Sequence, residues 1–104
     1  MRVTDQWLTI YGAANDLGVT RLGIAISRHF GNAVQRNRRK RLVREAFRRV
    51  RHQLPSGFDL VAVVRDNRGA EPSIQGLEDS ILHLADRLAT EMQRRQSRRR
   101  TPGS

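Results

Sequence analysis

Residues 32–51 read NAVQRNRRKRLVREAFRRVR and join the features of a core helix to a concentrated positive charge. The stretch holds eight arginines and Lys40 against a single acid, Glu45, so nine cations less one anion give a net charge of +8. The whole chain of 104 residues carries +10. Apolar residues nevertheless recur in it at helical spacing, at Val43, Ala46, Phe47 and Val50. A helix of this kind packs one stripe on a globular body and presents its charge to a polyanion.

At about 100° per residue, this predicted helix separates into a core side and a charged side. The core side continues through Leu54, while Arg38, Glu45 and Arg49 point elsewhere into solvent. Solvated helix faces usually mix both signs of charge, so a face of one sign predicts phosphate binding. Asn37 offers an amide that can also bind a base edge or a 2′-hydroxyl. The charged side comprises Asn37, Lys40, Arg41, Arg44, Arg48 and Arg51. The donors from Asn37 to Arg48 form a row about 16 Å long.

The composition fits one small domain that binds nucleic acid. Hydrophobic residues make up 38% of the chain, enough for a small core, and cysteine is absent, which excludes disulfides. Nineteen of the twenty basic residues are arginine, which suits phosphate recognition but is also typical of a GC-rich genome. The sequence has no apolar run of membrane-spanning length and no signal-peptide pattern. We therefore expect a soluble, cytoplasmic protein without a membrane partner.

Three strands and a second helix surround the charged helix. Residues 6–11 (QWLTIY) and 21–27 (RLGIAIS) predict an antiparallel hairpin, and 58–65 (FDLVAVVR) predicts a strand buried on both faces. Asn32 is the expected N-cap of the charged helix, and Pro55 is expected to stop it. A strand–helix–strand crossover places residues 21–27 and 58–65 parallel to each other.

A second amphipathic helix is expected to follow a cap at Ser73. The element order is then β-β-α-β-α, a small single-domain α+β sandwich whose sheet is covered on one face. Residues 1–92 form this domain, and residues 93–104, which carry five arginines and no apolar residue, predict a disordered basic tail. The apolar stripe of the second helix comprises Ile74, Leu77, Ile81, Leu84, Leu88 and Met92.

The sequence contains no constellation typical of a protein active site. His29, His52 and His83 lack metal-ligand spacing, and the acidic residues are scattered without a pair suited to acid–base catalysis. We therefore expect no catalytic and no metal-ligating residue in the protein. If the protein serves a reaction, its partner supplies the chemistry.

The stretch GNAVQRNRRKRLVREAFR, from Gly31 to Arg48, resembles the RNR signature of the bacterial ribonuclease P protein component. The strands on either side, RLGIAIS and FDLVAVVR, fit the same family, and the resemblance covers about residues 6–92. It implies a subunit of the ribonucleoprotein endonuclease that removes 5′ leaders from precursor tRNA. The RNA subunit would hold the catalytic centre and the Mg²⁺ ions, and the protein alone would bind no cofactor. The partners implied are that RNA, in a complex with one copy of a monomeric protein, and precursor tRNA.

The resemblance also assigns roles to individual residues and a left-handed crossover to the strand–helix–strand unit, against the usual rule. Arg28 and His29 stand where the family commonly has two lysines, and Arg48 joins the site as part of the predicted donor row. An aromatic residue of the first strand, Trp7 or Tyr11 with Ile10 as a neighbouring register, would line the leader cleft. The residues placed near RNA or metal by the motif are Asn32, Arg36, Asn37, Arg38, Lys40, Arg41 and Arg44.

One departure from the family concerns the start of the chain. Family members begin with a further helix and a short strand before the position of Val3, and that helix forms one wall of the leader cleft. Here Met1 lies close to the first strand, so either the sequence starts short of that helix or this member does without it. In both cases we expect leader binding to be less secure than binding of the RNA subunit.

The same charge would also suit other classes of protein. The main alternative to a ribonuclease P subunit is a non-enzymatic basic RNA-binding or RNA-chaperone protein. A DNA-binding helix-turn-helix is disfavoured because the basic helix precedes a buried strand instead of following a short helix. A membrane-surface helix is disfavoured because the apolar side is needed for the core.

Overall fold

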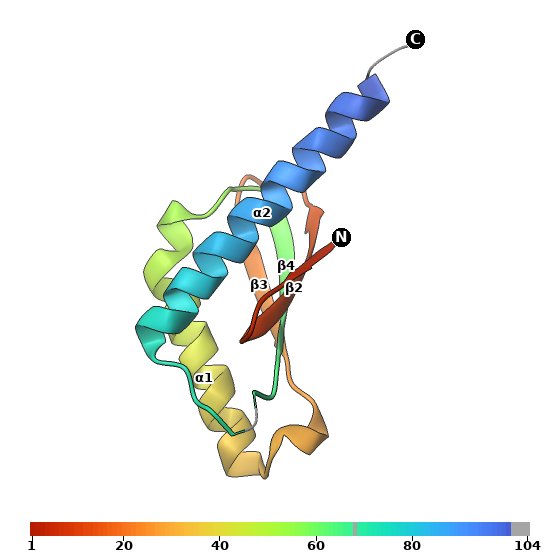
Figure 1. The fold of residues 1–104 in the computed structure, drawn as a ribbon. Coiled ribbons are helices and arrows are strands. Elements are labelled where there is room, and N and C mark those ends of the chain that lie inside the picture. The colour runs from red at the N-terminus through yellow and green to blue at the C-terminus, as the bar shows by residue number, and fades with distance from the viewer. Residues whose placement is uncertain (68, 101–104) are drawn as a thin grey trace.

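The computed structural model describes residues 1–67 and 69–100 of the chain, with side chains described through residue 95. It contains four strands and two long helices (Figure 1). Two short 3-10 turns, η1 and η2, stand at the two ends of the first helix. The elements are β1 (Arg2–Thr4), β2 (Leu8–Ala14), β3 (Arg21–Ala25), η1 (Arg28–Phe30), α1 (Ala33–Val50), η2 (Arg51–Gln53), β4 (Phe58–Val64) and α2 (Ile74–Arg100).

The four strands form one mixed sheet in the order β1-β2-β4-β3. β4 is parallel to β3, as the crossover through α1 predicts, and antiparallel to β2. The predicted hairpin of the first two long strands is wrong, because β4 lies between β2 and β3. β4 is the most continuously apolar strand, and a central position lets it pair along both edges. The short strand β1, which pairs with β2, was not predicted.

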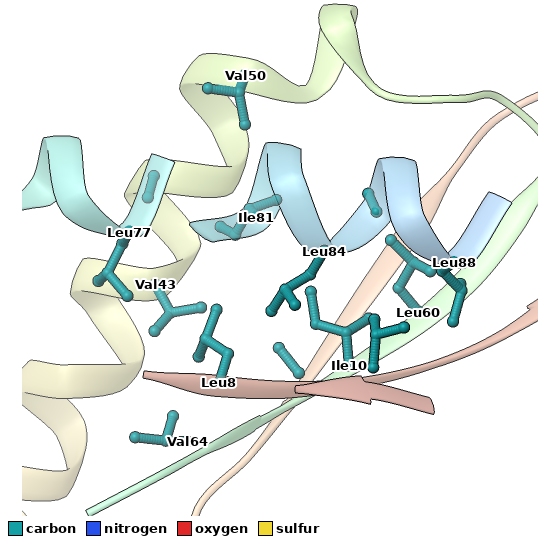
Figure 2. Close-up of a cluster of buried hydrophobic side chains, with 14 residues drawn as sticks. Leu8, Ile10, Val43, Val50, Leu60, Val64, Leu77, Ile81, Leu84 and Leu88 are labelled. Atoms are coloured by element: carbon teal, nitrogen blue, oxygen red, sulfur yellow. The ribbon is translucent and has the colours of Figure 1, made fainter. Parts of the chain in front are cut away.

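Both helices lie on the same side of the sheet, which confirms the predicted single covered face (Figure 1). Side chains of β2, β4, α1 and α2 point into the space between them (Figure 2). The predicted stripes are confirmed, since each contributes several of its members to this core. The buried residues are Val3, Leu8, Ile10, Val43, Ala46, Val50, Leu60, Ala62, Val64, Leu77, Ile81, Leu84, Ala85 and Leu88.

The other side of the sheet, here called the open face, is not covered by any described element. Val61 is 43% exposed, and Tyr11, its partner in the β2–β4 register, is 42% exposed. The prediction that residues 58–65 are buried on both faces is therefore wrong: an apolar run shows that a strand is central, not that both of its sides are covered. The open face is made by the strand residues that alternate with the core: Arg2, Thr4, Thr9, Tyr11, Ala13, Arg21, Gly23, Ala25, Asp59, Val61 and Val63.

The helix α2 begins at its predicted cap and runs further than predicted. The backbone N–H of Gly76 donates to the Ser73 hydroxyl at 2.9 Å, which caps the first turn. The helix continues to Arg100 and so includes residues 93–100, for which the sequence predicts a tail. Arginine and glutamine are good helix formers, and an ion pair between Arg94 and Glu91 at 3.2 Å supports this part of the helix. Residues 101–104 of the predicted tail lie outside the described residues.

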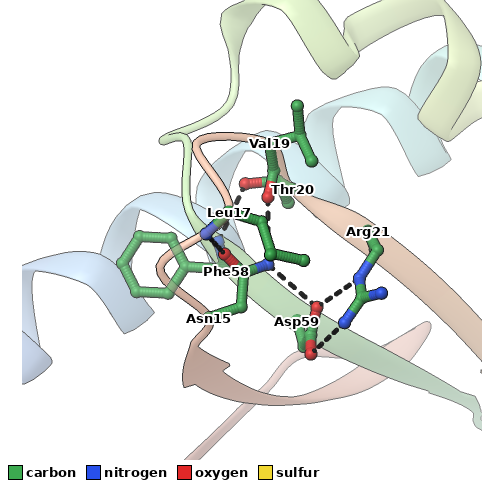
Figure 3. Close-up of polar contacts among 7 residues, drawn as sticks. All are labelled: Asn15, Leu17, Val19, Thr20, Arg21, Phe58 and Asp59. Carbon is green, nitrogen blue, oxygen red and sulfur yellow. Dashed lines mark hydrogen bonds and ion pairs between the residues drawn. The ribbon is translucent and has the colours of Figure 1, made fainter.

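A polar cluster at one end of the sheet fixes three strands relative to one another (Figure 3). Asp59 accepts two hydrogen bonds from the Arg21 guanidinium, both at 2.8 Å, and one from the Asn15 amide at 2.9 Å. These bonds, with that of Arg21 first, lower the pKa of Asp59 from its usual 3.8 to about 2. Thr20 adds a bond to the Pro55 carbonyl at 2.5 Å. The loop between β2 and β3 is thereby held against the start of β4.

Candidate RNA interface

The charged helix α1 begins after Asn32, the predicted N-cap, which forms a capping box with Gln35. The Gln35 N–H donates to the Asn32 side chain at 2.9 Å, and the Gln35 side chain accepts from the Asn32 N–H at 2.9 Å. Arg36 donates to the carbonyls of Gly31 at 2.5 Å and Arg28 at 3.3 Å. Asn32 and Arg36 thus fix the start of the helix against η1 in the free protein.

Four residues on the exposed side of α1 form what we call the cationic row: Asn37, Lys40, Arg41 and Arg44. Burial of Val43, Ala46 and Val50 on the opposite side fixes which way these residues face. Within residues 1–67 and 69–95, the three cations of the row make no ion pair. They are therefore available to an external anion, and their own repulsion is relieved when one binds.

The turn η1 extends the cationic row beyond the N-terminus of α1. Its Arg28 and His29 are exposed, and the His29 N–H donates to the Ser27 hydroxyl at 3.1 Å. The bond from Arg36 to the Arg28 carbonyl joins the turn directly to the helix. The structure therefore places both predicted residues beside the row.

Two other predicted cations already have anionic partners. Arg38 pairs with Glu71 at 3.0 Å, and Arg48 pairs with Glu45 at 2.7 Å. The hydrogen bond from Arg48 lowers the pKa of Glu45. An RNA phosphate would have to replace a carboxylate at either position, so these arginines are less available than the cationic row.

The structure separates the two aromatic residues predicted for the leader cleft. Tyr11 lies on the open face, while Trp7 is half-buried against the core in a hollow that it shares with Ser80 and His83 of α2. Only Tyr11 can meet a ligand on the open face. The strand does not begin until Leu8, because the Asp5 carboxylate accepts from the Trp7 N–H at 2.8 Å and the Leu8 N–H at 3.0 Å and holds Trp7 in the preceding turn.

Arg65 was not predicted and borders the open face at the end of β4. Its guanidinium donates to the Thr4 hydroxyl at 3.2 Å and to the Asp5 carbonyl at 2.5 Å. Side chains alternate between the two faces of a strand, so Arg65 could have been placed on the same face as Val61 and Val63 from the sequence alone.

Arg39 was also missed and is buried at 5% exposure. Its guanidinium lies over the Phe30 ring, 4.8 Å from the centroid, and donates to the Ala70 carbonyl at 3.1 Å. It precedes Val43 by four residues and Ala46 by seven, so helical periodicity alone would have placed it on the core stripe.

The arrangement of exposed cations in the site suits the binding of an extended anion. The described residues contain no group of three or more His, Cys, Asp or Glu side chains placed to hold a metal ion. None of the helices in the described part of the chain is long and apolar enough to cross a membrane.

Comparison with known proteins identifies a family for this fold and charge pattern. The family described as Ribonuclease P matches residues 1–89. The ribonuclease P protein component of Pelotomaculum thermopropionicum is 40% identical over 85 residues, which cover 82% of this chain and 75% of that protein. The protein of the same name from Thermotoga sp. strain RQ2 is 40% identical over 87 residues, covering 81% and 74%.

Solved structures give the same result. The RNase P protein from Thermotoga maritima has a TM-score of 0.76 and 31% identity, covering 84% of this chain and 82% of that one. A Staphylococcus aureus RNase P protein mutant with defective mRNA degradation activity has a TM-score of 0.72 and 27% identity, covering 86% and 75%.

Proposed function

The chain belongs to the ribonuclease P protein family, and on that premise we propose that its cationic row and η1 form the surface that binds the RNA subunit. Family membership makes it a protein component of ribonuclease P, the endoribonuclease that processes tRNA, with the ribonuclease P RNA as partner. It also favours this function over that of a non-enzymatic RNA chaperone.

The observation that carries the proposal is that Arg41 and Arg44 are exposed and Lys40 is half-buried, all three without acidic partners in the described residues. Phosphates that bind such cations release condensed counterions, which drives association and makes it depend on salt. The capping box and the buried stripe hold the row on a rigid helix, so little order is lost on binding.

The open face is the proposed path of the precursor tRNA leader. Tyr11 offers an exposed ring on which a base can stack, with the Val61 side chain beside it. Arg65 stands at the border of this face and can reach a phosphate. Such a surface binds single-stranded RNA with little sequence preference.

Catalysis is proposed to belong to the RNA subunit and its Mg²⁺ ions. We further propose a monomeric protein in a one-to-one complex with the RNA, acting in the cytoplasm.

Reconstitution with the cognate RNA tests the proposed function directly. At low Mg²⁺ concentration, the protein is expected to stimulate removal of the 5′ leader from precursor tRNA. If leader removal by the RNA is unchanged when the protein is added, the chain is not a working subunit.

The binding surface is tested by the salt dependence of RNA affinity. Arg41→Ala and Arg44→Ala should each reduce the slope of log affinity against log salt by about 0.7 to about 0.9, the values per phosphate contact for single strands and for duplex B-DNA. Arg87→Ala, an exposed cation on α2, is the control with equal charge loss and should leave the slope nearly unchanged. Equal slopes for all four proteins would reject the cationic row as the interface.

The leader path is tested by comparing precursor tRNA with mature tRNA. Tyr11→Ser should weaken binding of the precursor in the complex by about 5- to 150-fold, the equivalent of one lost base–aromatic stack of ~1–3 kcal/mol, without affecting mature tRNA. Tyr11→Phe keeps the ring and should bind like the unaltered protein. Equal loss with both tRNAs would place the leader elsewhere.

A further inference from the structure

The first half of α1 reaches the body of the protein without apolar contacts. Val34 is 76% exposed, and the apolar stripe of the helix starts only at Leu42 and Val43. Before these residues, the one buried side chain of the helix is Arg39. The half of the helix that carries Asn37, Lys40 and Arg41 is therefore attached mainly through a charged residue.

The Arg39 guanidinium joins three segments of the chain. It lies 4.8 Å from the centroid of Phe30 in η1, and it donates at 3.1 Å to the carbonyl of Ala70 in the loop before α2. Its neighbour Arg38 reaches the same loop through the ion pair with Glu71 at 3.0 Å. Together these contacts hold η1, the start of α1 and the loop in one arrangement.

Stability alone does not account for an arginine at this position. Burial lowers the pKa of Arg39, since the charged form loses water, and its Nη1 is covered without a hydrogen-bond partner within the described residues. A well-packed apolar side chain of similar length would avoid both costs. An apolar side chain would not donate to the Ala70 carbonyl or attract the face of the Phe30 ring.

We propose that Arg39 is a positioning residue that sets the geometry of the RNA-binding surface by fixing η1 to the first turns of α1. It acts through Phe30 on the turn that carries Arg28 and His29, and through Ala70 on the loop that braces the helix. Arg39 itself contacts no RNA. The inference rests on the proposed function, because it concerns the same surface.

Two substitutions remove the contact from opposite sides. Arg39→Met removes the guanidinium and fills its place with an unbranched apolar chain, while Phe30→Leu removes the ring and leaves the net charge unchanged. If Arg39 positions the surface, either substitution shifts the cations of η1 and of the first turns of α1 relative to one another. Both variants are then expected to reduce the slope of log RNA affinity against log salt by about 1.8, the equivalent of two phosphate contacts.

The controls separate positioning from charge and from unfolding. Arg87→Met loses one charge on α2 and is expected to leave the slope nearly unchanged, and Phe30→Tyr keeps the ring and should bind like the unaltered protein. Arg39→Met is expected to unfold at the same or a higher temperature than the unaltered protein. In the free protein, amide hydrogen exchange should accelerate in residues 28–38 of both test variants but not in the core of α2 around Ile81 and Leu84.

Two results would overturn the inference. In one, Arg39→Met lowers the slope by no more than one contact and Phe30→Leu has no effect, which would show that Arg39 leaves its place and binds phosphate itself. In the other, both variants bind and exchange like the unaltered protein, which would show a purely local role. The proposed function is judged separately by the unaltered protein and Arg41→Ala, so its failure is distinguishable from that of the inference.

Discussion

Glu45 is the only acid in α1, and its removal should strengthen RNA binding. Both of its carboxylate oxygens accept from Arg48, at 2.7 and 2.8 Å, and one lies 3.5 Å from Arg49. Glu45→Gln keeps the shape of the side chain and removes its charge. Arg48, which the sequence places on the same side as the cationic row, then becomes available to phosphate.

The expected size follows from one added contact. One further phosphate neutralised by Arg48 steepens the slope of log affinity against log salt by about 0.9. Between about 50 and about 200 mM salt, this adds about a 3.5-fold loss of affinity to that of the unaltered protein. At the lower salt concentration, the variant should bind the RNA subunit more tightly than the unaltered protein does. The change in stability should be small, because the ion pair is exposed.

Fluorescence anisotropy with labelled RNA subunit, measured over a series of salt concentrations, provides the slope. Glu78→Gln is the matched control: it also removes an acid that pairs with Arg49, at 3.5 Å, but on α2 and away from the row. Its slope should equal that of the unaltered protein. The reasoning fails if Glu45→Gln gives an unchanged or shallower slope, or if both variants steepen it equally.

Two further predictions concern the stability of the fold. Gly12→Ala places a Cβ against the buried side chain of Leu88 and should lower the free energy of unfolding in urea by about 1–3 kcal/mol. The control Gly23→Ala, whose Cβ has no neighbour closer than 3.9 Å, should not destabilise the protein. Equal urea midpoints for the two variants would contradict the tight packing of β2 on α2. The pKa of Asp59 is held at about 2 by Arg21, so the stability that this bond adds is complete above the usual pKa of 3.8 and is lost as the pH falls towards 2. Asp59→Asn should therefore make the unfolding temperature less dependent on pH in that window. Parallel profiles of unfolding temperature against pH for the variant and the unaltered protein would argue against the bond.

Local signals made α1 and its binding residues predictable. The Asn32 cap acts on its immediate neighbours, and the stripe from Val43 to Val50 follows from helical geometry. The helix ends earlier than predicted, at Val50, and a 3-10 turn at Arg51–Gln53 precedes Pro55. The exposed row on the adjoining side follows from the same periodicity. The sequence therefore placed Lys40, Arg41 and Arg44 correctly, although their contacts with RNA stay a prediction.

The strand order, and whether a given cation is paired or buried, depend on distant parts of the chain. β2 and β3 are neighbours in sequence, but β4, which follows α1, pairs with both and lies between them. The pairing of Arg38 with Glu71 and the burial of Arg39 under the loop at Ala70 join residues about thirty positions apart. Helical periodicity places Arg39 on the core side of α1, but the carbonyl of Ala70 that accepts its hydrogen bond lies in a distant loop that no local pattern reveals.

The place of β4 between β2 and β3 also bears on how the chain folds as it is synthesised. The ribosome completes β2, β3 and the strongly basic α1 before Phe58–Val64 exists. Until that segment emerges, β2 can pair only with the short β1, and β3 lacks its partner in the described sheet. Contacts of this range close slowly, and a helix without its sheet exposes its apolar stripe. We therefore expect the nascent chain to present a basic helix to the RNA-rich ribosome surface while its body is still unfolded. Emergence of β4 would then allow the sheet to form, and the folded body would be complete once α2 adds its side of the core.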